Sequence, residues 1–215
     1  MKIEKRSILT EGNKDIQYTH IQNNSQVICF MFSGSGYTYD KPLFYYSTMV
    51  MLENNFDVVH IHYSYNQSEL NLPKDELANL IVEDVNPVVK EVIGNGDYDE
   101  TIFLGKSLGT IPIISMFAND SIYSNSKMII LTPLLQHDLY YKRLLESKNK
   151  TLLVIGNVDT HYIPEKVTKL AEKTNFNIIE IVNANHSLDI EQLATSKSIT
   201  ALNDLITDLK DFISK

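Results

Sequence analysis

One pentapeptide of this sequence has the residue types and the spacing of a nucleophilic site. Gly105-Lys106-Ser107-Leu108-Gly109 matches the pattern G-x-S-x-G and directly follows a short apolar run at residues 101–104. In a turn of this kind between a strand and a helix, the glycines leave room for a strained backbone that lifts the serine hydroxyl above a sheet. The start of the helix that follows favours the negative charge that develops there. The pattern predicts that Ser107 acts as a nucleophile.

A serine hydroxyl is a weak nucleophile without a neighbouring base, and His186 is the best placed of the six histidines. It follows the apolar run 178–182 in Asn183-Ala184-Asn185-His186, so its side chain can reach over the end of a sheet. The remaining histidines lie within an expected strand, in the first hairpin, or at loop positions that favour lining a pocket or contacting solvent: His20, His60, His62, His137 and His161. We therefore predict that His186 is the base.

The base needs an acid that fixes its tautomer and stabilises the charged imidazole. Asp159 lies just past the apolar run 152–155, in Gly156-Asn157-Val158-Asp159, and completes the chain order Ser, Asp, His. Asp138 and Asp189 are weaker alternatives for this role. A single aspartate in such a loop is often only a helix cap. Three suitable residues, each after its own strand, are better explained as a catalytic triad.

A tetrahedral intermediate also needs N–H groups that point at its oxyanion. We expect one from the backbone of Leu108, the residue after the nucleophile. The second donor is expected in the loop Ser33-Gly34-Ser35-Gly36, where the glycines allow close approach of the backbone. Ser35 is our choice, with Gly36 or Tyr37 as alternatives.

Short apolar runs that alternate with helical patterns must position these residues. A hairpin is expected at residues 2–9 and 15–21, around the turn at 11–14. Further strands are expected at residues 27–32, 58–62, 101–104, 128–131, 152–155 and 178–182. Because these runs do not alternate polar and apolar residues, they predict an α/β fold, a mostly parallel sheet of about eight strands with helices on both faces. In such sheets the chemistry lies beyond the carboxyl ends of the strands, where all the candidates above are expected.

Composition narrows the possible partners. The chain has 215 residues, which suits one domain spanning residues 1–215, and a formal net charge of −8, which disfavours nucleic acid as a partner. No run approaches the roughly 20 apolar residues of a membrane span, so we expect no membrane partner and a cytoplasmic location. The one cysteine, Cys29, lies in an apolar run and is expected to be a core residue.

These motifs and their order resemble those of the α/β-hydrolases over nearly the whole chain. The segments 156–159 and 184–187 are similar to those of small bacterial serine hydrolases and dienelactone-hydrolase-like proteins. The chain departs from them in having Ser33-Gly34 where many members have His-Gly, and a serine where dienelactone hydrolases use cysteine. Many members insert a cap domain after the strand that follows the nucleophile. Here residues 134–150 leave room for one helix, so we expect no cap domain and an open site.

The sequence therefore predicts a serine hydrolase that cleaves a carboxylic ester or thioester through an acyl intermediate on Ser107. Neither a metal nor an organic cofactor is required, and the expected partner is a small-molecule acyl substrate. Loop position suggests that its apolar group contacts Tyr37, Leu134, Leu135, Tyr140 and Ile163. Two alternatives remain open: a peptide or amide hydrolase with the same triad, and a non-catalytic binding module with this fold.

Overall fold

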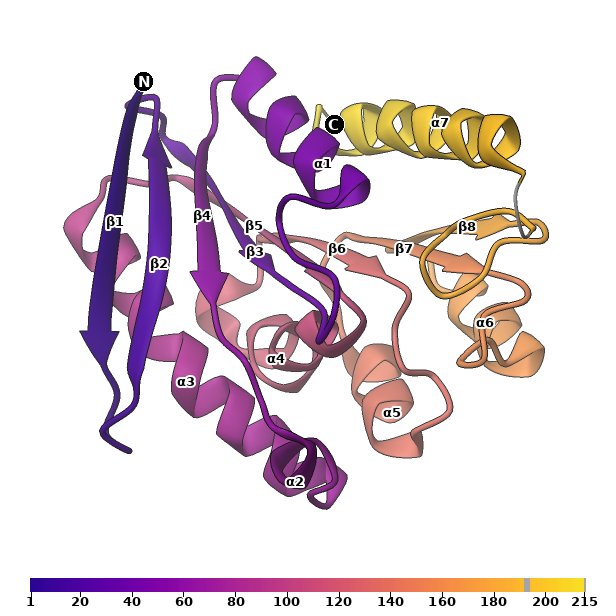
Figure 1. Ribbon diagram of the computed structural model, residues 1–215, viewed down its shortest axis with the longest axis horizontal. Coiled ribbons are helices and arrows are strands. Elements are labelled where there is room, and N and C mark those ends of the chain that lie inside the picture. Colours follow the sequence, from indigo (N-terminus) through magenta and orange to yellow (C-terminus); the bar gives the residue numbers. More distant parts are fainter. Residues whose placement is uncertain (192–193, 215) are drawn as a thin grey trace.

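The computed structural model describes residues 1–191 and 194–214, which contain one sheet of eight strands in the order β1-β2-β4-β3-β5-β6-β7-β8 (Figure 1). The strands are β1 (Lys2–Leu9), β2 (Asp15–Gln22), β3 (Val27–Phe32), β4 (Asp57–His62), β5 (Glu100–Lys106), β6 (Lys127–Leu131), β7 (Thr151–Gly156) and β8 (Phe176–Ile181). β1 and β2 form the expected antiparallel hairpin, and β2 pairs antiparallel with β4. All pairs from β4 to β8 are parallel. The predicted sheet is thus confirmed.

Helices cover both faces of the sheet, as the unalternating strands required. They are α1 (Pro42–Glu53), α2 (Gln67–Leu70), α3 (Lys74–Asn95), α4 (Thr110–Ser115), α5 (Asp138–Glu146), α6 (Pro164–Ala171) and α7 (Thr195–Ile213). α1 and α7 lie on one face, and α3, α4, α5 and α6 lie on the other (Figure 1). Two apolar clusters fill the space between these layers and the sheet. The central strands are therefore buried on both sides.

The connections between strands differ in detail from the expectation. The helix expected from residue 107 begins with a 3₁₀ turn, η1 (Ser107–Gly109), before α4. α3 continues through Pro87 to Asn95, so the proline lies inside the helix. α2 is an additional short helix, which begins with a capping box between Asn66 and Glu69.

Among residues 1–191 and 194–214, no cap domain covers the carboxyl edge of the sheet. Between β6 and β7 the described chain contains α5 as its only helix, which agrees with the expectation from the length of residues 134–150. The loops after β3, β5, β6, β7 and β8 therefore share an open edge. In the described part of the chain, no helix combines the length and the apolar character that crossing a membrane requires.

Candidate active site

The turn between β5 and α4 holds Ser107 in a strained conformation. Its φ angle is 54°, in the left-handed region that residues other than glycine avoid. Glycines are needed beside it for close packing. A β-carbon on Gly105 would lie 2.3 Å from the carbonyl oxygen of Gly109, and one on Gly109 would lie 2.0 Å from that of Phe32. The two glycines thus allow the turn to pack closely against the ends of β5 and β3.

Ser107, His186 and Asp159 form one hydrogen-bonded chain across three of these loops. Ser107 Oγ lies 2.8 Å from His186 Nε2, and His186 Nδ1 lies 2.8 Å from Asp159 Oδ2. With its proton on Nδ1, the imidazole donates to the carboxylate, and its Nε2 can accept the serine proton. The three predicted residues are therefore arranged for removal of a proton from Ser107.

The Asp159 carboxylate is buried but well supplied with donors. Its side chain has no exposed area, whereas that of His186 is 34% exposed. Asp159 Oδ1 accepts a hydrogen bond of 2.9 Å from the backbone N–H of His161. Burial alone would raise the pKa of this carboxyl group, but the hydrogen bonds from His186 and from His161 bring the pKa below its usual range. The group is therefore an anion at neutral pH.

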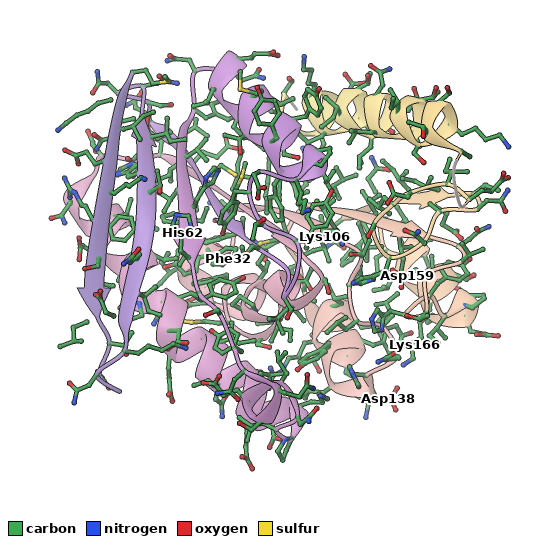
Figure 2. All side chains as sticks on the ribbon, in the orientation of Figure 1. Phe32, His62, Lys106, Asp138, Asp159 and Lys166 are labelled. Atoms are coloured by element: carbon green, nitrogen blue, oxygen red, sulfur yellow. The ribbon has the colours of Figure 1, made fainter. Side chains whose placement is uncertain are left out.

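The weaker candidates for the acid lie elsewhere. Asp138 is the first residue of α5, and its carboxylate pairs with Lys166 of α6 at 2.6 Å. In Figure 2 the pair lies below Asp159, and Asp138 is the more distant of the two. Asp189 is exposed, and its backbone closes the loop after β8 through hydrogen bonds with Asn185. Neither contact brings these carboxylates to the imidazole of His186.

His161 is closer to the site than its sequence position indicated. Its ring lies 4.8 Å from that of His186, centroid to centroid, at an interplanar angle of 69°. Burial lowers the pKa of His161, and nearby His186 lowers it further. The spacing Asp-x-His was the available signal, because an aspartate side chain commonly accepts from the N–H two residues on. The loop position by itself predicts only pocket lining or solvent contact for His161.

The turn after β3 lies directly against the nucleophile. Tyr37 N–H donates to the Gly34 carbonyl at 3.3 Å, which places Ser35 and Gly36 at the exposed tip of the turn. A β-carbon on Gly34 would lie 3.5 Å from Cβ of Ser107. The predicted second oxyanion donor is thus on a segment that borders the serine, while Leu108 is its chain neighbour.

The five residues expected to contact the substrate fall into two groups. Tyr37, Leu134 and Ile163 are partly exposed. Leu135 and Tyr140, however, have exposed fractions of 0% and 1% and belong to the apolar core. The Tyr140 hydroxyl also donates to the backbone carbonyl of Lys74 at 3.0 Å. These two side chains are core residues that a substrate cannot reach, so the prediction that they contact the substrate is wrong.

One set of side chains has the spacing of a metal site within the described residues. Asp159, His161 and His186 offer ligand atoms that all lie within 4.8 Å of one another. Two of these atoms, on Asp159 and His186, are already joined by the hydrogen bond described above. We assign no metal to this group.

A cavity of about 640 Å³ between β8 and α7 lies away from the serine and has no part in the site.

Several solved structures share the fold of this chain. The structure resembles an esterase from Pyrococcus furiosus with a TM-score of 0.75 and 14% identity, covering 99% of this chain and 92% of that one. It also resembles a serine hydrolase without a lid from Xanthomonas campestris, with a TM-score of 0.70 and 13% identity over 99% of this chain and 94% of that one. A serine hydrolase homologue from Coxiella burnetii gives a TM-score of 0.68 and 14% identity over 96% and 97%.

This chain therefore has the α/β-hydrolase fold in a form without a cap. No family model and no curated protein matches its sequence. At 13–14% identity, the solved structures establish the fold, and the chemistry has to be argued from the site itself.

Proposed function

We propose that this chain is a serine hydrolase that cleaves carboxylic esters or thioesters through an acyl intermediate on Ser107. The hydrogen-bonded chain from Ser107 through His186 to Asp159 carries this proposal. A binding module has no need of a base and an acid in that arrangement. The solved structures with the same fold include proteins described as esterases and serine hydrolases, which supports the same class of reaction.

The reaction follows from the two hydrogen bonds. Ser107 Oγ attacks the carbonyl carbon of the substrate while His186 Nε2 takes the hydroxyl proton. The proton then passes to the leaving alcohol or thiol as its bond to carbon breaks, which leaves an acyl group on Ser107. Water then attacks the acyl carbon while His186 Nε2 takes its proton. The proton passes to Ser107 Oγ as the bond from this oxygen to the acyl carbon breaks, which releases the acid. The Asp159 carboxylate stabilises the charged imidazole at both stages.

The backbone supplies the remaining stabilisation. We propose that the N–H groups of Leu108 and Ser35 bind the oxyanion, because their segments flank the serine. The acyl or alkyl group would contact Tyr37, Leu134 and Ile163, which are partly exposed on loops around this edge. Since no cap encloses the site, we expect small acyl substrates to enter directly from solvent.

A fluorophosphonate probe tests the class, because it forms a covalent bond only with an activated serine. We expect one label, located on the peptide that contains Ser107 by mass spectrometry. Turnover is then compared for short and medium acyl esters, the matching thioesters and the matching amides. We expect esters or thioesters to react and amides to react much more slowly. An unlabelled, inactive protein would instead favour the non-catalytic binding module.

A further inference from the structure

The residue before the nucleophile is a lysine whose side chain is buried within the site. Lys106 is 1% exposed, although it lies beside a partly exposed serine. Lysine is rarely buried to this extent without a carboxylate partner. In the described part of the chain its ammonium group forms no ion pair, and its hydrogen-bond partners are uncharged oxygens. A buried cation without a direct ion-pair partner costs free energy of folding, so it calls for a role other than stability.

The contacts of the ammonium group connect four segments of the site. Lys106 Nζ donates to the backbone carbonyl of His186 at 2.7 Å and to Thr132 Oγ1 at 3.1 Å. It also lies 4.7 Å from the centre of the Tyr37 ring. The lysine at the end of β5 thus reaches the loops after β8, β6 and β3. Figure 2 shows Lys106 over the middle of the sheet, with Asp159 toward the β8 side.

The hydrogen bond from Lys106 reaches His186, the residue whose position matters most to the proposed reaction. The imidazole must remain within hydrogen-bond reach of both Ser107 and Asp159, and a displacement of about 1 Å can lower a rate by about 10²-fold. The loop that carries His186 is exposed at Asn185, Ser187 and Asp189. A charge-assisted hydrogen bond to its main chain, about twice as strong as a neutral one, restrains that loop from beneath.

We propose that Lys106 is a positioning residue, whose buried ammonium group holds the backbone of His186 so that the imidazole stays aligned between Ser107 and Asp159. This inference rests on the proposed role of His186 as the base. Lys106 itself does not contact the substrate. The side chain of Lys106 points toward the His186 carbonyl and Thr132, and its ammonium group donates to these two residues rather than to the hydroxyl of Ser107.

The charge of Lys106 is sensitive to pH. Burial lowers its pKa to about 8, although the carboxylates of Asp159 and Asp189 partly oppose this shift. Further titratable groups near it are Tyr37, His161 and His186. Above about pH 8 the group loses its proton, and the hydrogen bond to His186 becomes a weaker neutral one. The proposal therefore predicts a decline of kcat on the alkaline side.

Three variants test the proposal, with a short p-nitrophenyl ester as the substrate. Lys106→Met keeps the shape and removes the charge and the donors. It should lower kcat about 10- to 100-fold, change KM less than about twofold, and leave the melting temperature equal or higher. Lys106→Arg keeps a charged donor, so it should recover kcat at least in part and move the alkaline decline upward. Thr132→Val removes the hydroxyl partner but keeps the bond to the His186 carbonyl, so it should leave kcat within about twofold.

A measurement without turnover separates this inference from the proposed function. NMR would follow the signal of the His186 Nδ1–H proton, which lies in the hydrogen bond to Asp159, in the wild type and in Lys106→Met. In Lys106→Met this signal should shift or be lost through exchange with solvent, whether or not any ester is cleaved. If ester cleavage is absent but this signal still changes, the proposed function fails and the positioning role stands.

Other outcomes would overturn the inference. An unchanged signal with kcat within about twofold of the wild type would show that Lys106 does not position His186. A kcat that falls together with a large drop in melting temperature, in Lys106→Met and in Thr132→Val alike, would make Lys106 a structural residue only.

Discussion

The fully buried carboxylate of Asp159 lies 2.8 Å from Nδ1 of His186, a ring that is itself one-third exposed. The pair thus joins the interior of the protein to a surface that a substrate can reach. Because the carboxylate also accepts the N–H of His161, it is held in place from two sides. This arrangement leads to predictions for Ser107, His186 and Asp159.

Ser107→Ala should lower ester turnover by about 10⁶-fold, the scale found when a triad serine is removed. Labelling by a fluorophosphonate should disappear as well. The fold should persist, because a single hydroxyl is lost from a partly exposed turn. Turnover and circular dichroism of the purified variant check both points. Normal turnover would remove Ser107 as the nucleophile.

Asp159→Asn should lower kcat by about 10⁴-fold, because an amide does not hold the imidazole in the tautomer that accepts a proton at Nε2. Asp189→Asn is the matched control on a neighbouring loop, and its kcat should change little, since the Asp189 backbone makes the hydrogen bonds of that loop. Steady-state kinetics of both variants decide the assignment. If the control is the impaired enzyme, the acid has been assigned to the wrong residue.

His186→Ala should be as inactive as Ser107→Ala, and the double variant should be no worse, because residues that act as one unit are not additive. His161→Gln should keep activity within about tenfold of the wild type. Its backbone N–H, which Asp159 accepts, is retained in that variant. Comparison of kcat/KM across the four proteins tests this. A His186→Ala enzyme with near-normal rates would require a different base.

Replacing Ser107 by glycine should give a more stable protein than replacing it by alanine. The φ of 54° costs an L-residue about 1–2 kcal/mol, and glycine escapes this cost but loses about 0.5–1 kcal/mol through its greater chain entropy. We therefore expect Ser107→Gly to exceed Ser107→Ala by up to about 1.5 kcal/mol in free energy of unfolding. Urea denaturation of the two inactive variants measures the difference. A Ser107→Gly variant that is less stable than Ser107→Ala would show that the turn holds no such strain.

The stability of the wild type relative to Lys106→Met should rise between about pH 8 and about pH 10.4. In the folded protein burial lowers the pKa of Lys106 to about 8, whereas an unfolded lysine titrates near 10.4. Between these values the unfolded chain binds more protons, so the free energy of unfolding increases with pH. Lys41→Met, at an exposed lysine, is the control and should show no such trend relative to the wild type.

Much of this fold could be predicted because its signals are local. Apolar runs of four to six residues between helical patterns predicted the strands, and their lack of alternation predicted a sheet buried on both faces. G-x-S-x-G after β5, and the positions of Asp159 and His186 after β7 and β8, predicted which loops carry the candidate site. The carboxyl ends of parallel strands meet at one edge, so chain order alone indicated that these loops are neighbours.

What the tertiary structure decided concerns directions and contacts between segments. The sequence did not indicate that Leu135 and Tyr140 point into the core, because a loop position does not fix where a side chain points. Nor did it indicate that the Lys106 ammonium group meets the carbonyl of His186, 80 residues further along the chain. Such contacts depend on turn conformation, on strand order and on helix packing, which arise only when the whole chain has folded. The sequence by itself therefore determined the fold class and indicated the candidate site residues, and the tertiary structure determined what holds those residues in place.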